Sequence, residues 1–492
     1  MRHQRLSHAQ TARNLADVPA GAAAYGVAIW ESLRRTTDEQ ILVIFLSNSK
    51  VTHYELHRVE AVGTWECDMD KHFGRKRIGI IGAGIAGLHL GLRLRQLNID
   101  CTIMTDRSAE QVASSKLTNT VVHWPATLGR ERVLRVYHWP AEEFGFHKFR
   151  HVIRTPKPIE ILNWAVKPAR AIDYRIYLPA LMEDFVERGG HLEVAPVEAK
   201  EMCCIAERFD LVVVATPGGG FADLFPRDPV HSPYDRPQRY WLAGLFTGFR
   251  LSEMHGAIWS VVPGLGEAVA FPMLSRTGMV VALAIGSRHA DELAILRVLS
   301  SRPARTGFCA ALLNKLEQLH PTIYQQIDTA RFTLQGPDDL VQVAITPVVR
   351  HPHAYLGGGR YAVALGDVHV TVDPLLAQGA NIGSYSAFAL ADAIEEAGTF
   401  DLRFCEDVQH CRAARILGAS RWTNAFLLPP DAARNELMTT MSRDRHLARE
   451  YFENFSRPDR QWDRVGSAER IRDWLDETRM HTVELAAAAA IA

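Results

Sequence analysis

A glycine-rich turn between an apolar segment and an amphipathic segment constrains the fold more than any other feature of the chain. The turn reads Gly82-Ala83-Gly84-Ile85-Ala86-Gly87, in the spacing GxGxxG. It follows the apolar stretch Arg77–Ile81, and apolar residues then recur at helical spacing from Ala86 to Leu97. Asp100–Met104 is a second short apolar stretch. The order predicts a strand, a helix and a strand, the βαβ unit that opens an α/β domain.

Each glycine of the turn suits a dinucleotide. Gly82 permits the tight turn, Gly84 lets the backbone approach a pyrophosphate, and Gly87 lets the helix pack closely on the sheet. The phosphates would lie on backbone N–H groups at the helix N-terminus, with Ala83 in the same loop. On the other face of this helix we place His89, Arg93 and Gln96.

The end of the second strand should supply a partner for a ribose. An acidic residue about 20 residues after the glycines normally accepts the ribose hydroxyls. The sequence there reads Thr105-Asp106-Arg107. We predict that Asp106 has this role, with Thr105 sharing it and Arg107 beside them. An ordinary Asp at the end of a strand is the alternative interpretation.

A second motif far along the chain separates FAD from NAD. It contains Gly366-Asp367, then Pro374, and then Gln378-Gly379-Ala380-Asn381. A strand that ends in Gly-Asp can present a carboxylate to sugar-like hydroxyls, and the helix start after it offers N–H groups to an anion. We expect these residues to hold the ribityl chain and the ring of a flavin. A surface loop with a chance Gly-Asp is the alternative.

Together these motifs resemble the flavoprotein hydroxylase fold. The strand Phe209–Thr216, which reads FDLVVVAT, is also similar to that family. Hydroxylases that take NADPH directly usually carry an additional Asp-Gly motif, and this chain contains no Asp-Gly dipeptide. The Trp-x-Trp-x-Ile-Pro signature of flavin halogenases is also missing. The motifs therefore favour neither an internally reduced hydroxylase nor a halogenase.

The rest of the chain predicts a discontinuous organisation. Two continuously apolar segments, Leu211–Ala215 and Tyr361–Leu365, are typical of buried parallel strands, whereas Ala268–Phe271 and Met279–Ile285 look antiparallel. We expect an α/β fold with a Rossmann-like FAD-binding domain, a β-sheet substrate domain and a helical C-terminal region. The predicted boundaries are 1–74 for an extension of uncertain status, 75–135, 168–235 and 355–400 for the FAD-binding domain, 136–167 and 236–354 for the substrate domain, and 401–480 for the helical region.

Composition excludes several classes of function. With 55 Lys and Arg against 56 Asp and Glu, the net charge of −1 indicates neither a nucleic acid nor an anionic membrane as partner. No run approaches the ~18 apolar residues that span a bilayer, and the N-terminal residues lack the apolar h-region typical of a signal peptide. Seven scattered cysteines without a CxxC pair argue against disulfides and zinc. We expect a cytoplasmic protein without a metal, and we interpret His351-Pro352-His353 as a turn.

Several longer strings resemble the oxygenase component of two-component styrene and indole monooxygenases. The resemblance runs from about residue 75 to about residue 476, and its most specific string surrounds Gly366. The strings are Ile80–Leu90, Thr105-Asp106-Arg107, Asn119-Thr120-Val121, WPAEEFG at 139–145, AIDYRIY at 171–177, LGDVHVTVDPLLAQGAN at 365–381, RWTN at 421–424 and QWDR at 461–464.

The resemblance implies a mechanism in which the flavin carries the chemistry. A separate NADH-dependent reductase would supply reduced FAD, which would react with O2 to form a C4a-(hydro)peroxyflavin and epoxidise a styrene-like or indole-like alkene. The protein would bind, orient and exclude water, without an acid–base triad. Pro374 would lie beside the reactive edge of the flavin. The family also allows a homodimer.

The same resemblance implies the residues of a substrate pocket. These are Asn119, Val121, His123, Phe146 and Ala169, for each of which core packing is the alternative. Alanine at position 169 is more similar to the indole type than to the styrene type, which usually carries serine. Lys116 stands where the family tends to have arginine. These departures leave the preferred substrate and the product enantiomer open.

Two other functions share the flavin motifs. A flavin oxidase or dehydrogenase would keep FAD tightly bound and be reduced directly by its substrate. A flavin carrier or sensor would bind FAD without transferring oxygen to any alkene, and it would have no need of a large substrate domain.

Overall fold

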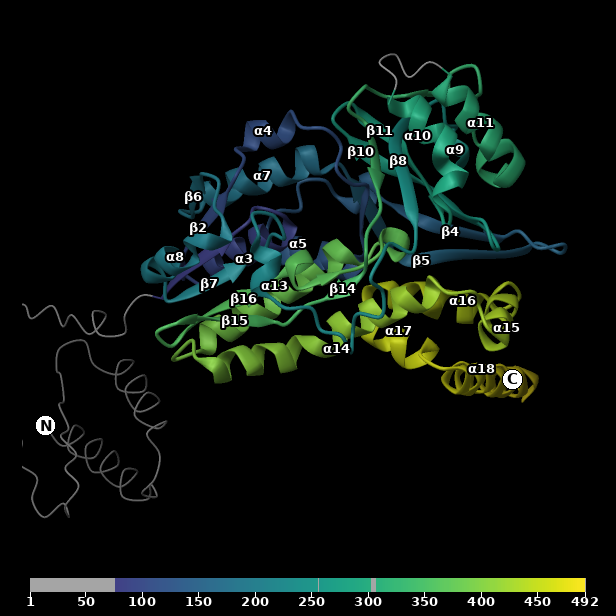
Figure 1. Ribbon diagram of the computed structural model, residues 1–492. Helices are drawn as coiled ribbons and strands as arrows, with labels where there is room; N and C mark the ends of the chain where they lie inside the picture. The colour runs from purple at the N-terminus through teal and green to yellow at the C-terminus, as the bar shows by residue number, and fades with distance from the viewer. Residues whose placement is uncertain (1–75, 255, 302–306, 492) are drawn as a thin grey trace, which may run out of the picture. The chain divides into compact units, whose positions relative to one another are not determined.

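The computed structural model describes residues 76–254, 256–301 and 307–491. The expected extension at residues 1–74 lies outside these described residues. The described part contains two large sheets, a two-stranded sheet of β14 and β17, helices that pack on the large sheets and a series of C-terminal helices (Figure 1). Within it, no helix is both long and apolar enough to cross a membrane.

The first sheet has six strands in the order β15-β16-β7-β1-β2-β6. Neighbouring strands from β16 to β6 are parallel, and only the edge strand β15 is antiparallel to its neighbour. The predicted strands near residues 77, 100, 211 and 361 are therefore confirmed to within a residue or two of their ends. The strands are β1 (Arg77–Ile81), β2 (Asp100–Thr105), β6 (His191–Val194), β7 (Leu211–Val214), β15 (His353–Gly357) and β16 (Arg360–Ala364).

Helices cover both faces of this sheet, which explains why its strands are apolar throughout. Ile78 and Ile80 of β1 point to one face and belong to one buried cluster with residues of three helices, α3 (Ile85–Gln96), α7 (Tyr174–Glu187) and α13 (Gly379–Glu396). Ile81 points to the other face and packs in a second cluster with α8 (Met202–Arg208). Side chains of a strand alternate between faces, so a doubly covered sheet requires apolar residues at every position.

The polar side predicted for helix α3 is wrong at His89. This residue is fully buried, because α13 packs along that side of α3. Its ring nitrogens lie 2.9 Å from Ser384 Oγ and 2.8 Å from Tyr177 Oη. Burial lowers the pKa of His89 to about 3, so the ring is neutral. Arg93 and Gln96 keep partial exposure, as expected.

The second sheet has nine strands and is mainly antiparallel. β10 and β11 contain the two segments predicted as antiparallel, and they pair with each other in that sense. The exceptions are the parallel pair β4 and β9 and the short parallel pairing of β10 with β5. The strands are β3 (Val121–His123), β4 (Phe146–Ile153), β5 (Ile159–Ile172), β8 (Tyr240–Thr247), β9 (Gly256–Val262), β10 (Gly266–Ser275), β11 (Gly278–Ser287), β12 (Thr333–Leu334) and β13 (Leu340–Val343).

Both faces of the second sheet are also covered. Val281 and Leu283 of β11 pack with helices α10 (Ala294–Ser301) and α11 (Phe308–Leu319). Ala282 between them points the opposite way and packs with residues of the C-terminal helices α15 and α16. The remaining elements are β14 (Val348–Val349), β17 (Val370–Thr371), α4 (Ala109–Ala113), α5 (Pro125–Leu134), α6 (Ala141–Phe144), α9 (Leu251–Met254), α12 (Pro321–Tyr324), α14 (Leu402–Phe426), α15 (Ala432–Met441), α16 (Arg445–Glu453), α17 (Pro458–Val465) and α18 (Ala468–Ile491).

The chain passes between the two sheets several times. β3, β4 and β5 of the second sheet lie in the chain between β2 and β6 of the first sheet. β8 to β13 of the second sheet then come before β15 and β16, which return to the first sheet. Six short 3-10 segments lie in the described part, of which Gly366–Val368 and Pro374–Leu376 matter for the site; the others are Ala199–Glu201, Phe221–Leu224, Ala290–Leu293 and Asn454–Ser456. The discontinuous domain boundaries stay a prediction.

The turn between β1 and α3 generates a stability test. A Cβ added to Gly87 would overlap the carbonyl oxygen of Gly82, which is backbone and cannot move aside. We predict that Gly87→Ala lowers the free energy of unfolding in urea by about 2 kcal/mol or more. Gly84→Ala is the matched control, because no heavy atom lies within 4 Å of a Cβ added there. Equal losses in the two variants would contradict this account of the turn.

Candidate active site

The start of helix α3 leaves backbone donors without a side-chain cap. Gly82 has a φ of +111°, and its N–H donates to the carbonyl oxygen of Met104 at 2.8 Å. The helix then begins at Ile85 after the extended residue Gly84, which provides no cap, and the first turn holds no acidic residue. The N–H groups of a first helical turn have no partner within the helix. This end of α3 therefore suits an anion.

The later motif supplies a second helix N-terminus of the same kind. Gly366 follows strand β16 with a φ of +68°, and Asp367 comes directly after it. Pro374 opens the next short turn, and α13 begins at Gly379 without a side-chain cap and without an acid in its first turn. The start of α13 thus presents backbone N–H groups that have no partner within the helix.

The two motifs are in contact although some 280 residues separate them. A Cβ added to Gly366 would lie 3.1 Å from the Cβ of Ala86 in α3, and one added to Gly383 in α13 would lie 3.4 Å from it. Larger residues at these positions would push the two helices apart. The close approach brings both helix N-termini to one cavity, which Gly84, Ile85 and Ala86 line together with Gly366, Gly379 and Gly383.

The cavity has a volume of about 470 Å³ and takes in about half of the predicted site residues. Those that line it are Gly84, Arg107, Asn119, Val121, Phe146, Gly366, Asp367, Pro374, Gly379 and Ala380. Those that lie outside its lining are Gly82, Ala83, Gly87, Thr105, Asp106, His123, Ala169, Gln378 and Asn381. Several of these outer residues are direct sequence neighbours of a lining residue, so they help to place the backbone that reaches the cavity.

The expected ribose partners lie at the end of strand β2 and directly after it. Asp106 has a side chain 71% exposed and pairs with Arg107 at 3.8 Å. Thr105 is buried at the end of β2. Of the three residues only Arg107 lines the cavity. The ribose role of Asp106 stays a prediction.

Asp367, which belongs to the motif after strand β16, presents a carboxylate to the cavity. The residue lines the cavity and has exposed surface, and the surrounding protein desolvates its carboxylate. Removal from bulk water raises the pKa of this carboxyl above its ordinary value. A neighbour that donates hydrogen bonds would stabilise the ionised form and lower the pKa again.

Gln378 and Asn381 hold the backbone rather than facing the cavity. The Asn381 amide donates to the carbonyl oxygens of Val122 (2.9 Å) and Ala377 (2.7 Å). Its Oδ1 accepts from the Trp124 N–H at 3.0 Å and from Thr127 Oγ1 at 2.7 Å. The buried Gln378 donates to backbone oxygens of Leu376 and Phe455. These bonds fix the first turn of α13 against β3 and α5.

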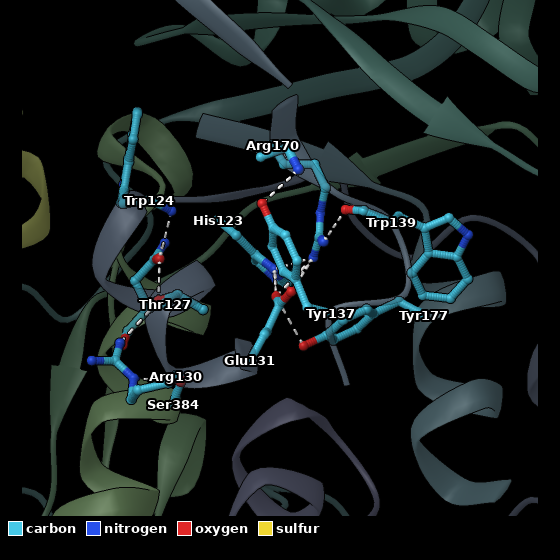
Figure 2. A network of polar contacts seen from close by, with 12 residues as sticks. His123, Trp124, Thr127, Arg130, Glu131, Tyr137, Trp139, Arg170, Tyr177 and Ser384 are labelled. Atoms are coloured by element: carbon cyan, nitrogen blue, oxygen red, sulfur yellow. Dashed lines mark hydrogen bonds and ion pairs between the residues drawn. The ribbon is translucent and has the colours of Figure 1, made fainter. Parts of the chain in front are cut away.

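His123 belongs to a fully buried polar network, shown in Figure 2. Its Nδ1 lies 2.6 Å from Glu131 Oε1 and its Nε2 lies 3.0 Å from Tyr174 Oη. Arg170 donates to both oxygens of Glu131 at 2.7 Å, and Tyr177 donates to Oε1 at 3.2 Å. Both ring nitrogens of His123 are therefore engaged away from the cavity.

The charges of this network balance within the protein. Burial alone would raise the pKa of Glu131, but its hydrogen bond and charge interaction with His123, and then the positive charge of Arg170, lower it to about 2. Burial lowers the pKa of His123, which leaves the carboxylate and the guanidinium as the charged pair. Tyr174 lines the cavity and connects it to the network. The sequence gives no sign of the Glu131–Arg170 pair, because 39 residues separate its members.

The remaining walls of the cavity are mainly apolar and come from the second sheet and from helix α16. Neither Trp241 nor Trp259 was expected from the sequence. His151 stacks on Trp259 with ring centroids 4.2 Å apart, and within the described residues its ring nitrogens have no hydrogen-bond partner. Burial lowers the pKa of His151 to about 3, so it is neutral. The walls include Phe146, Phe149, Trp241, Ala243, Ala257, Trp259, Val269, Phe271, Ala284, Val341, Val343 and Phe452.

In the described part of the chain no group of three or more His, Cys, Asp or Glu residues could hold a metal ion. The segment around His351 and His353 forms no such group. The cavity offers backbone donors, the Asp367 carboxylate, the arginines Arg107 and Arg150 and a large aromatic wall.

Comparison with solved structures defines the class of fold. The flavin-dependent brominase Bmp2 has a TM-score of 0.60 at 13% identity, covering 82% of this chain and 99% of that chain. A flavoprotein/dehydrogenase from Cytophaga hutchinsonii has a TM-score of 0.55 at 11% identity, covering 77% and 92%. The fold is thus that of flavin-dependent halogenases and related flavoproteins, which confirms the expected fold class.

Comparison of sequences defines the family. Styrene monooxygenase StyA from Pseudomonas sp is 38% identical over 409 residues, covering 82% of this chain and 98% of that protein. StyA from Pseudomonas fluorescens has the same identity and coverage. A family profile for the putative substrate binding domain of styrene monooxygenase A matches residues 218–326. The chain belongs to the styrene monooxygenase family.

The cavity fits the FAD that this family and fold imply. The open space beside Gly84 admits a pyrophosphate at the uncapped N-terminus of α3. The uncapped N-terminus of α13 and the accessible Asp367 carboxylate lie at the same cavity, which continues between the aromatic walls of the second sheet. Donors for anions, an acceptor for hydroxyls and an apolar space for a ring are the three surroundings that this cofactor requires.

The buried network generates a test of stability against pH. Glu131→Gln would leave Arg170 as an unpaired buried charge, so we predict a loss of about 3–5 kcal/mol in the free energy of unfolding at pH 7. The wild-type carboxylate stabilises the fold above its unfolded pKa of 4.5, and this contribution is lost as pH falls toward about 2. The difference between the two proteins should shrink over that range in urea titrations.

Glu142→Gln is the matched control, because Glu142 pairs with Arg132 at the surface with 61% of its side chain exposed. Surface pairs contribute little to stability. A loss in this variant as large as that in Glu131→Gln, or a difference that does not change between pH 7 and pH 3, would contradict the assigned role of the network.

Proposed function

We propose that the chain is an FAD-dependent monooxygenase that uses reduced FAD from a separate reductase, together with O2, to epoxidise styrene-like or indole-like aromatic alkenes. The observation that carries the proposal is one cavity that joins two helix N-termini and Asp367 to an aromatic pocket of the second sheet. When bound, reduced FAD supplies the activation of O2 and the transfer of one oxygen atom.

The cofactor end of the cavity binds and orients. Backbone N–H groups after Gly84 would hold the pyrophosphate with the help of Arg107. The Asp367 carboxylate would accept hydrogen bonds from the ribityl chain. Gly379 and Ala380 would place the N–H groups of α13 at the polar edge of the ring. Pro374, which is exposed to the cavity, would border the reactive edge and offer it no N–H.

The substrate end excludes water and shapes the pocket. Asn119, Val121 and Phe146 line the cavity and would contact the alkene. Ala169 lies opposite Phe146 in the pairing of β4 with β5, behind the lining, so its size would act through the position of Phe146. His123 would act in the same indirect way through Tyr174. A pocket that excludes water limits the release of activated oxygen as hydrogen peroxide and so favours its transfer to the alkene.

The proposal includes partners and a location. The reduced flavin would come from an NADH-dependent flavin reductase, and the chain would act as a monomer or a homodimer. A cytoplasmic location is supported by Cys203, Cys204 and Cys411, which are exposed and free.

An oxidase or dehydrogenase with tightly bound FAD is the competing function, and the family comparison does not favour it. Purified chain, FAD, NADH, a flavin reductase and styrene should give styrene oxide, and indole should give an oxygenated indole product. The same mixture without the chain should give only hydrogen peroxide. A protein that purifies yellow, is reduced directly by a substrate and forms no oxygenated product would contradict the proposal.

A further inference from the structure

A buried hydrogen bond joins the aromatic wall of the cavity to the turn that carries Pro374. Trp241 of β8 lines the cavity, and its Nε1–H donates to Asp373 Oδ1 at 3.2 Å. The same oxygen accepts from the backbone N–H of Leu375 at 3.0 Å. Asp373 therefore ties strand β8 of the second sheet to the short turn Pro374–Leu376, whose residues also line the cavity.

The indole ring has little freedom on its other side. Trp241 is 5% exposed, and a Cβ added to Gly286 on the neighbouring strand β11 would lie 2.7 Å from its ring. Only a glycine at position 286 therefore accommodates the ring. Packing on one side and a hydrogen bond at the edge hold the indole as a fixed part of the wall.

The carboxyl group of Asp373 is costly where it lies. Its side chain is fully buried, and within the described residues Oδ2 has no hydrogen-bond partner. Burial raises the pKa of Asp373 to about 6. A buried carboxylate that satisfies only one oxygen destabilises a fold relative to an apolar or amide side chain of similar size. A role in placing the two parts of the site would account for an acid at this position.

We propose that Trp241 and Asp373 are positioning residues that set the spacing between the substrate wall and the Pro374 turn, and thereby how efficiently oxygen reaches the alkene. The inference rests on the proposed function. In the productive reaction, reduced FAD, O2 and an alkene give oxidised FAD, an epoxide and water. In the competing reaction, reduced FAD and O2 give oxidised FAD and hydrogen peroxide. A less firmly held aromatic wall would favour the competing reaction, which releases hydrogen peroxide, over epoxide formation.

The experiment measures hydrogen peroxide and epoxide formed per reduced FAD consumed, with reductase and styrene. Trp241→Phe keeps an aromatic side chain but removes the N–H donor. The ratio of peroxide to epoxide should therefore rise about three- to tenfold, the factor expected for one hydrogen bond. Trp259→Phe is the matched control, because its Nε1 has no hydrogen-bond partner among the described residues of the same cavity. It should raise the ratio by a clearly smaller factor.

Variants at Asp373 separate positioning from folding. Asp373→Asn keeps an acceptor oxygen and should stay close to the wild-type ratio, whereas Asp373→Ala should behave like Trp241→Phe. The double variant Trp241→Phe/Asp373→Ala should be no worse than either single variant, because both remove the same bond. Urea unfolding of each variant verifies that it is folded.

Equal factors in Trp241→Phe and Trp259→Phe, or factors that multiply in the double variant, would overturn the inference alone. A wild-type chain that forms no epoxide or indole product would instead overturn the proposed function.

Discussion

The close approach of helices α3 and α13 is the contact on which the rest of the site depends. Ala86 of the first helix lies against Gly366 and Gly383, so the two helices meet through residues with little or no side chain. Both helices begin without a side-chain cap and without an acidic first turn, and both beginnings line one cavity. Two helix N-termini that converge in this way create a region of positive potential for a phosphate-bearing ligand.

Buried polar bonds hold the surrounding elements in place. Asn381 fastens the start of α13 to β3 and α5 through three hydrogen bonds. The pair Glu131–Arg170 connects α5 to β5, with His123 and Tyr177 arranged around Glu131 (Figure 2). None of these side chains is required to react. They determine where the backbone of the cofactor site and the lining residue Tyr174 can lie, which is how a flavoenzyme uses its protein.

Local patterns in the sequence predicted the two turns at which we place the cofactor. The glycine spacing before α3 and the Gly366-Asp367 segment after β16 each specify a turn by backbone geometry, so both could be recognised without knowledge of their partner. The aromatic wall could not be predicted in this way. Trp241, Trp259 and His151 come from separate strands of the second sheet, and only the sheet pairing brings them together. The sequence placed His89 on the exposed side of α3 because its spacing matches the polar residues of that helix. The sequence pattern of one helix cannot show that a second helix, α13, covers that side.

The central claim is that one FAD molecule spans both motifs. The most direct measurement is a crystal structure of the chain with FAD bound. The account predicts phosphate oxygens at the N–H groups that follow Gly84, and the isoalloxazine ring beside Pro374 and the first turn of α13. A flavin bound elsewhere, or one that contacts the early glycines while its ring lies away from Gly379 and Pro374, would contradict it.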